Sequence, residues 1–282
     1  MGTDKRMRKK ENRRQRLGEL AQQAKRHKVR KRIVQVVISL AAVLVLTGII
    51  FVSGGDSSIT SETTVVDTTA VDNTAVDTTA NIPPTTLPGR AITGDTPCPA
   101  VDGSETRVTS FENAPPTCID ATHSYSAVVT TNKGDFTIVF DSLKAPLTVN
   151  SFVTLARYHF FDATSCHRAI IDFVVQCGDP TATGSGGPGY QFADELPTAG
   201  EYKVGSIAMA NSGANTNGSQ FFIITGTQGT SLPPNYTLFG QVTEGLDSTV
   251  PALNNASNPD PAANGVPPTE LLQIISVIIT ES

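Results

Sequence analysis

The second half of the chain alternates short apolar runs with turn residues, a pattern that predicts β-strands. Apolar and β-branched residues fill Tyr125 to Thr130 and Phe136 to Phe140, and Asn132-Lys133-Gly134 lies between these runs. Two such runs joined by a short turn with a glycine are typical of a β-hairpin. Further short strands follow, and Leu271 to Thr280 supplies a closing strand. The pattern therefore predicts a mostly β domain over residues 124–282.

Two segments in this half have helical rather than strand periodicity. Pro146 opens the first, as proline is favoured in the first turn of a helix. Apolar side chains then recur three and four positions apart, at Val149, Phe152, Val153 and Ala156. The second segment covers Glu244 to Asn254, where Pro251 is expected to shorten or kink the helix.

A single apolar span precedes this domain. Residues 33–52 contain 20 positions without a formal charge. At about 1.5 Å per residue a helix of this length crosses the hydrocarbon core of a bilayer. The alternative is a cleavable signal peptide, but its apolar region is usually about 7–15 residues long and ends at a small-residue cleavage site. We expect a retained transmembrane anchor at 33–52.

Charge is sorted along the chain, which has a formal net charge of −5. Residues 1–32 hold 14 basic and 3 acidic side chains, a net charge of +11, and the other 250 residues have a net charge of −16. Positive charge before an apolar span places residues 1–32 in the cytoplasm and the rest outside, which predicts a single-pass protein of the cell membrane. The basic block also suits contact with anionic lipid headgroups. A nucleic-acid-binding arm is the alternative, and we expect no nucleic-acid partner.

Residues 53–97 predict a disordered linker. They are rich in Thr, Asp and Pro, and the unit Val-Asp-Thr-Thr-Ala or a close variant occurs at 66–70, 71–75 and 76–80. Such a segment buries too little apolar surface to offset its ordering entropy. It is expected to hold the folded domain away from the membrane, with glycosylation of its threonines left open.

Two cysteines mark the lead-in segment, which we define as residues 98–123. Cys98 and Cys118 lie about twenty residues apart, near prolines. In an oxidising compartment such a pair predicts a disulfide that contributes roughly 3 kcal/mol. Free thiols or metal ligands are the alternatives, but no second Cys or His pair with metal-site spacing accompanies them, so we expect no metal.

Two longer motifs have no ordinary packing explanation. The first runs from Met209 to Ile223 as MANSGANTNGSQFFI, and the second is HRAIIDFVVQCGD over 167–179, followed by a glycine-rich stretch over 183–189. GGPGY at 186–190 and YTLFG at 236–240 extend them. In this order and spacing they resemble the cyclophilins, the peptidyl-prolyl cis/trans isomerases, over roughly residues 125–280. The resemblance implies a closed eight-stranded antiparallel barrel capped by two helices.

The resemblance also implies a site. Arg168 stands at the position of the family's catalytic arginine, whose guanidinium grips the prolyl carbonyl and approaches the nitrogen of the twisted bond. The substrate-binding positions of the family fall on Phe173, Val174, Gln176, Ala210, Asn211, Gln220, Phe222, Leu232 and Tyr236. Because bond rotation transfers no proton, His167 is interpreted as a structural, hydrogen-bonding histidine. No cofactor or metal is implied.

The sequence departs from the family pattern at several of these positions. Ile171-Asp172 stands where the family usually has Pro-Gly, and Cys166 and Cys177 replace the usual Phe and Gly. Ser231 occupies the place of the tryptophan of cyclosporin-sensitive members, which predicts weak inhibition by cyclosporin, and Tyr236 stands where many have His.

The positions of the two inner cysteines lead to an expectation about their pairing. Arg168 and Gln176 must share a face to meet one substrate, which centres the turn on Asp172. Side chains alternate along a strand, so this register sends Cys177 to the face opposite Cys166. We therefore expect Cys166 and Cys177 to remain free thiols.

Three classes of function compete. The leading one is a membrane-tethered isomerase that assists folding of secreted or envelope proteins at their proline-containing segments, expected as a monomer. The second is a chaperone or scaffold that binds proline-containing peptides with little turnover. Retention of Arg168 favours the enzyme, and a purely structural envelope protein would not need Arg168, Gln176 and Phe222 together.

Overall fold

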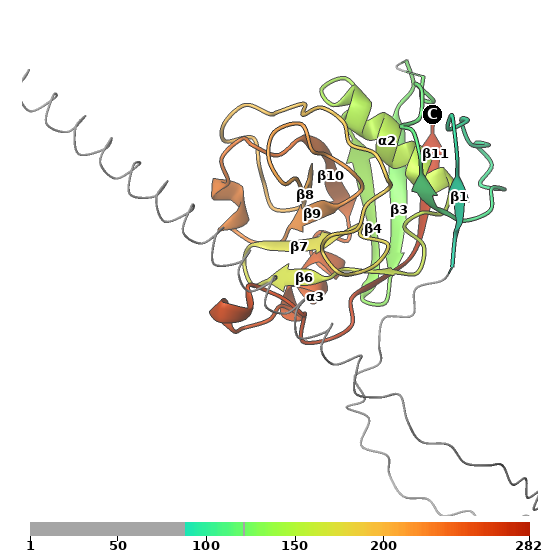
Figure 1. Ribbon diagram of the computed structural model, residues 1–282. Helices are drawn as coiled ribbons and strands as arrows, with labels where there is room; N and C mark the ends of the chain where they lie inside the picture. The colour runs from blue at the N-terminus through green and yellow to red at the C-terminus, as the bar shows by residue number, and fades with distance from the viewer. Residues whose placement is uncertain (1–87, 121) are drawn as a thin grey trace, which may run out of the picture. The chain divides into compact units, whose positions relative to one another are not determined.

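The computed structural model describes residues 88–120 and 122–282, which fold around one curled antiparallel sheet (Figure 1). The sheet has nine strands in the order β5-β11-β3-β4-β10-β8-β9-β7-β6. Their bounds are β3 Tyr125–Thr131, β4 Gly134–Phe140, β5 Thr164–Ser165, β6 Arg168–Ile170, β7 Val174–Cys177, β8 Ser206–Met209, β9 Phe221–Ile224, β10 Leu238–Glu244 and β11 Gln273–Glu281. The predicted hairpin is β3 and β4, and the predicted closing strand is β11.

The sheet corrects the expected barrel in number and closure. It has nine strands instead of eight, and in the described part of the chain β5 pairs only with β11 and β6 only with β7. The order of strands is therefore open, with the short strands β5 and β6 at its two ends. Within residues 88–120 and 122–282 no helix is long and apolar enough to span a membrane. The expected anchor at 33–52 lies outside the described residues, as do the basic block and most of the linker.

Among the described residues two α-helices accompany the sheet, together with the short 3₁₀ turns η2 (Gly229–Ser231) and η3 (Pro261–Ala263). Helix α2 (Pro146–Arg157) begins at the predicted proline and packs against β11. Helix α3 (Thr249–Asn255) is shorter than the expected Glu244 to Asn254, because β10 continues through Glu244. Pro251 lies in the first turn of α3, where a missing N–H removes no helical hydrogen bond.

The strands beneath the site are buried on both faces. Val175, Cys177, Phe221 and Ile223 belong to the main hydrophobic core. Their neighbours Val174, Phe222 and Ile224 point to the other face, as alternation requires, and form a second apolar cluster with Tyr202 and Ala208. This second cluster is the floor of the site described below.

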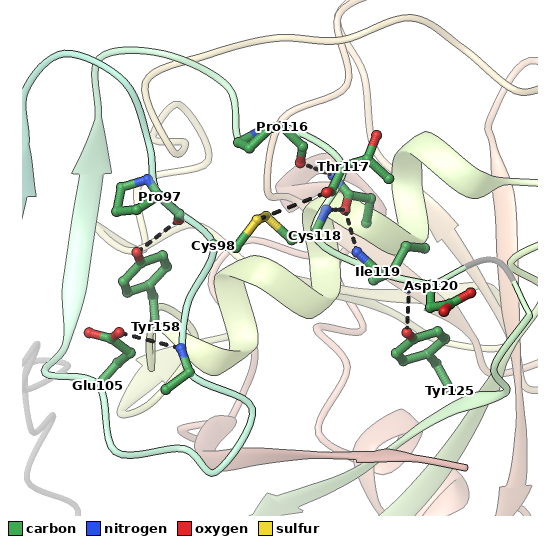
Figure 2. The surroundings of a disulfide bond; sticks show 12 residues. Pro97, Cys98, Glu105, Pro116, Thr117, Cys118, Ile119, Asp120, Tyr125 and Tyr158 are labelled. Atoms are coloured by element: carbon green, nitrogen blue, oxygen red, sulfur yellow. Dashed lines mark hydrogen bonds between the residues drawn. A yellow bond between two sulfur atoms is a disulfide. The ribbon is translucent and has the colours of Figure 1, made fainter.

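The lead-in segment is fastened to the domain and contributes to its core. Strand β2 (Val108–Phe111) pairs in parallel with β1 (Arg90–Ile92), and its two end residues are buried in the main core. The predicted bridge between Cys98 and Cys118 is present, with 5.3 Å between the Cα atoms (Figure 2). Near it the hydroxyl of Tyr158 donates to the carbonyl of Pro97 at 2.9 Å.

Candidate active site

Four side chains form one row across the strands β6, β7, β9 and β8. Arg168 is paired with Gln176, Gln176 with Phe222, and Phe222 with Ala208. Directly opposed residues share a face of the sheet. The row therefore brings a cation, an amide and an aromatic ring to the face of the second apolar cluster.

A cavity of about 150 Å³ lies over this row. It is lined by Arg168, Phe173, Val174, Gln176, Ala210, Asn211, Phe222, Leu232 and Tyr236. These are the site residues expected from the sequence except Gln220, which lines an adjacent cavity of about 810 Å³. Gln176, Ala210 and Asn211 border both cavities, so the two form adjoining parts of one surface.

The aromatic wall of the smaller cavity is held from behind. The rings of Phe222 and Tyr236 meet edge to face with 5.4 Å between their centroids. The hydroxyl of Tyr202 donates to the carbonyl of Tyr236 at 2.6 Å and accepts from its N–H at 3.2 Å. Burial raises the pKa of Tyr202 to about 12, so this hydroxyl stays protonated and fixes the backbone of Tyr236.

Arg168 stands at the polar edge of the cavity. Its Nη1 donates to Oε1 of Gln176 at 3.3 Å. Its Nε donates to the carbonyl oxygen of Asn264 at 3.1 Å, and its Nη2 donates to Oδ1 of the same residue at 3.0 Å. No carboxylate of the described residues forms an ion pair with it. Burial lowers the pKa of Arg168, but a guanidinium remains charged in proteins, so a positive charge without a counter-ion faces the site.

The amides of Gln176 and Gln220 connect Arg168 to the glycine-rich loop over 183–189. Nε2 of Gln176 donates to Oε1 of Gln220 at 2.9 Å. Nε2 of Gln220 in turn donates to the carbonyls of Gly184 and Gly186, at 3.1 and 2.8 Å. The orientation of Gln176 is thus fixed from both sides, with its oxygen toward the arginine.

The loop itself is organised by Asp179, whose side chain is fully buried. The carboxylate accepts hydrogen bonds from the backbone N–H groups of Thr181, Gly184 and Gly186, at 2.7, 2.7 and 2.9 Å. Burial alone would raise the pKa of Asp179, but these hydrogen bonds and the one from the Thr181 hydroxyl outweigh it and hold the pKa below its ordinary value. Asp179 is therefore an ionised anchor for the wall of the larger cavity.

His167 is buried, as a structural residue would be, but the expected hydrogen bond is not found. Its Nδ1 has no hydrogen-bond partner among the described residues. Burial lowers the pKa of His167; the charge of Asp179 opposes this change and that of Arg168 adds to it. The ring is therefore neutral near pH 7 and fills space beside the row.

The structure confirms the expected strand register but corrects the expectation about the inner cysteines. Arg168 faces Gln176 and the turn is centred on Asp172, yet Cys166 and Cys177 are joined, with 3.9 Å between their Cα atoms. The alternation argument fails because Cys166 lies before β6 begins. At this point the chain is still bonded to Leu272, the residue before β11: the N–H of Cys166 donates to the carbonyl of Leu272 at 2.8 Å. The alternation rule does not apply across this change of partner, and Cys166 belongs to the main core, as Cys177 does.

Three residues that shape the site were not found from the sequence. Asn264 contacts Arg168 from 96 positions away, Asp179 organises the loop, and Tyr202 fixes Tyr236. An Asp followed two residues later by Thr is a turn signal that could have indicated Asp179. The dipeptide Asn264-Gly265 also indicates a turn, but no local signal places that turn beside Arg168.

Comparison with known proteins identifies the fold's relatives. The family model described as "Cyclophilin type peptidyl-prolyl cis-trans isomerase/CLD" matches residues 126–277. The chain belongs to this family. The matched residues include every cyclophilin site position named above, while residues 88–125 lie before the match.

Among curated proteins, "Probable peptidyl-prolyl cis-trans isomerase B" of Mycobacterium tuberculosis is 40% identical over 169 residues, which cover 55% of this chain and 54% of the relative. A "Putative peptidyl-prolyl cis-trans isomerase" of Staphylococcus aureus is 46% identical over 121 residues, covering 42% and 59%. The chain spans about half the length of the curated relatives it matches. A solved cyclophilin-type structure from Cryptosporidium parvum has a TM-score of 0.49 at 29% identity and covers 56% of this chain and 99% of that one.

Proposed function

We propose that this protein is a peptidyl-prolyl cis/trans isomerase that assists the folding of extracytoplasmic proteins. The observation that carries the proposal is the guanidinium of Arg168, which has no counter-ion among the described residues and stands at the edge of the apolar cavity that Phe222 floors. Family membership and the names of the curated relatives support the same activity.

The arrangement suits rotation about an X–Pro bond. That rotation has a barrier of about 18–20 kcal/mol because of amide resonance. A catalyst lowers the barrier if it binds the twisted amide more tightly than the planar forms. The proline ring occupies the apolar cavity, and the remaining N–H groups of Arg168 donate to the prolyl carbonyl and to the nitrogen, which gains a lone pair as the bond twists. The reaction needs neither a nucleophile nor a general base.

Arg168→Ala tests the assignment. In a proline-limited refolding assay with the full-length protein we expect the catalysed rate to fall by about two orders of magnitude, or roughly 2.7 kcal/mol of transition-state stabilisation. Peptide affinity should fall far less, because Arg168 acts chiefly in the transition state. The matched control is Arg90→Ala, which removes an exposed arginine paired with Glu105 at 3.7 Å. If Arg168→Ala leaves the rate unchanged, the alternative function is favoured, namely a module that binds proline-containing peptides with little turnover.

The cellular setting is part of the proposal. The protein is tethered to the cell membrane by 33–52, with residues 1–32 in the cytoplasm against anionic lipids and a monomeric domain outside. The two disulfide bridges support an oxidising compartment, since such bonds are rare in the cytosol. Protease added to intact cells should remove the folded domain, and full-length protein in the soluble cytosol would contradict the topology.

A further inference from the structure

The loop between α3 and β11, residues 256–272, lies along the outer edge of β6, the last strand of the sheet. The backbone of Ala169 forms two hydrogen bonds with it. Its N–H donates to Gly265 O at 2.9 Å, and its carbonyl accepts from Asn258 N–H at 3.1 Å. The loop therefore occupies part of the open edge of β6, directly beside Arg168.

The turn that carries Asn264 is shaped for this position. Asn264 ends η3 in the left-handed region, with φ 51° and ψ 37°, a conformation that asparagine tolerates better than most residues. The next residue, Gly265, has φ +77°, and a Cβ there would lie 2.6 Å from the carbonyl oxygen of Ala169. At the other end of η3, Asp260 accepts from Ala262 N–H at 2.8 Å. The sequence thus fixes both oxygens of Asn264 opposite the arginine.

Those two oxygens hold one edge of the guanidinium, since Nε donates to the carbonyl and Nη2 to Oδ1. An arginine has five N–H donors in a rigid plane. With Nη1 also donating to Gln176, one N–H on each terminal nitrogen is left for the substrate. Three hydrogen bonds to two residues define both the position and the plane of the fork.

We infer that Asn264 is a positioning residue for Arg168: it holds the guanidinium in the plane from which its last two N–H groups meet the twisted prolyl amide. This inference rests on the isomerase function proposed above. Asn264 lines neither cavity, so it acts on the substrate only through Arg168. Without the side-chain oxygen the guanidinium keeps its charge, but its plane is less restricted about the Cδ–Nε bond and its two terminal nitrogens exchange places more readily, so fewer molecules are ready to stabilise the transition state.

Two variants of the full-length protein test this. Asn264→Gly keeps the left-handed backbone and its carbonyl but removes Oδ1, since glycine adopts positive φ freely. Asn264→Asp keeps an acceptor at Oδ1. In the refolding assay we expect kcat to fall about tenfold in Asn264→Gly, as for loss of a hydrogen bond to a charged group, with peptide affinity unchanged. The fall should be smaller in Asn264→Asp, which keeps the acceptor although its carboxylate adds a counter-ion beside Arg168. In an Arg168→Ala background, Asn264→Gly should have no further effect.

The outcomes separate this inference from the proposed function. If wild type catalyses, Arg168→Ala does not, and Asn264→Gly matches wild type, the positioning role is wrong. Equal losses in the Gly and Asp variants, or an added loss in the Arg168→Ala background, would also overturn it. If wild type itself does not catalyse, the proposed function fails, and the clamp is still tested by NMR. Separate Nη1 and Nη2 signals of Arg168 should appear in wild type and Asn264→Asp and merge in Asn264→Gly; separate signals in all three would refute the clamp.

Discussion

The two disulfide bridges close loops of different length and lie at different places relative to the site. Cys98–Cys118 closes a loop of the lead-in segment before the family match, with a sequence separation of 20. Cys166–Cys177 spans 11 residues and lies two residues before Arg168 and one after Gln176. The outer bridge therefore closes a loop within the lead-in segment. The inner bridge instead joins the two strands of the hairpin that carries the proposed catalytic arginine.

Strand alternation fixes the face of a side chain only within a paired ladder. The outer pair was predictable because a loop imposes no facing rule on its cysteines. The expectation for the inner pair was wrong because Cys166 lies two residues before the ladder of β6 and β7. Between Cys166 and Arg168 the pairing partner of the chain changes from the β11 side to β7. The pairing of Arg168 with Gln176 and the Cys166–Cys177 bridge occur in the same structure. The bridge is therefore compatible with Gln176 lining the site.

The largest effect should come from the core contact inside the outer loop, since it decides whether that loop is an appendage. Phe111 is buried against Tyr158, with 5.6 Å between ring centroids, and its N–H donates to Pro188 O at 2.7 Å. Phe111→Ala should lower the free energy of unfolding by about 3–5 kcal/mol, measured by denaturant titration. Val101→Ala, at a side chain 69% exposed in the same loop, is the control and should change it little. If Phe111→Ala and Val101→Ala lower the free energy of unfolding by the same small amount, the lead-in segment does not contribute to the core.

Opening the outer bridge comes next. Cys98→Ala with Cys118→Ala should lower the free energy of unfolding by about 3.3 kcal/mol on loop entropy for roughly twenty residues. Catalysis by the folded molecules should persist, because no cavity-lining residue lies in this loop. Isomerase assays at a temperature well below the unfolding midpoint check this; a large drop in rate there would erase the contrast between the bridges.

Opening the inner bridge should reverse the balance between stability and activity. Cys166→Ala with Cys177→Ala opens a shorter loop, for which the same relation gives a loss of about 2.8 kcal/mol in the free energy of unfolding. The rate should nevertheless fall about tenfold, because Arg168 and Gln176 lose the covalent tie beside them and small displacements of catalytic groups are costly. If the rate stays at the wild-type value, the inner bridge contributes to stability and not to the position of Arg168 and Gln176.

The smallest effect concerns a non-covalent tie at the end of the lead-in segment. A hydrogen bond from His123, aided by Arg157 and Tyr125 and opposed by burial, lowers the pKa of Glu281 to about 2. A carboxylate with a depressed pKa stabilises the fold above its unfolded pKa and loses that contribution as the pH falls through the folded value. Wild-type stability should thus decline between about pH 4.5 and 2, and Glu281→Gln should flatten part of that decline. Parallel pH profiles for the two proteins would contradict this.

The sequence predicted much of the fold because its signals were local. The hairpin of β3 and β4, the start of α2 at Pro146 and the strand β11 followed from periodicity and turn residues. The open edge of the sheet could not be predicted in this way. Closure depends on whether the end strands β5 and β6 pair with each other, and no short sequence pattern encodes that pairing. Glu244 was assigned to a helix because apolar spacing in a short segment does not separate the end of a strand from the start of a helix.

The candidate site was predicted only as far as family motifs extend. Arg168, Gln176 and Phe222 lie in matched motifs and meet in one row. Asn264 and Tyr202 contact those residues from distant parts of the chain, and that proximity is a property of the folded sheet. His167 lies inside a motif, yet its unpartnered Nδ1 depends on what packs around it.

The place of β11 in the sheet has a consequence for biosynthesis. It is the last strand in the sequence but lies between β5 and β3, and Ser282 exchanges backbone hydrogen bonds with Ser124 at 2.8 and 3.1 Å. Until residues 273–281 are free to pair, the edge of β3 opposite β4 has no partner strand, and such edges invite pairing with other chains. Each newly made copy must therefore be kept apart from its neighbours until β11 has paired with β3.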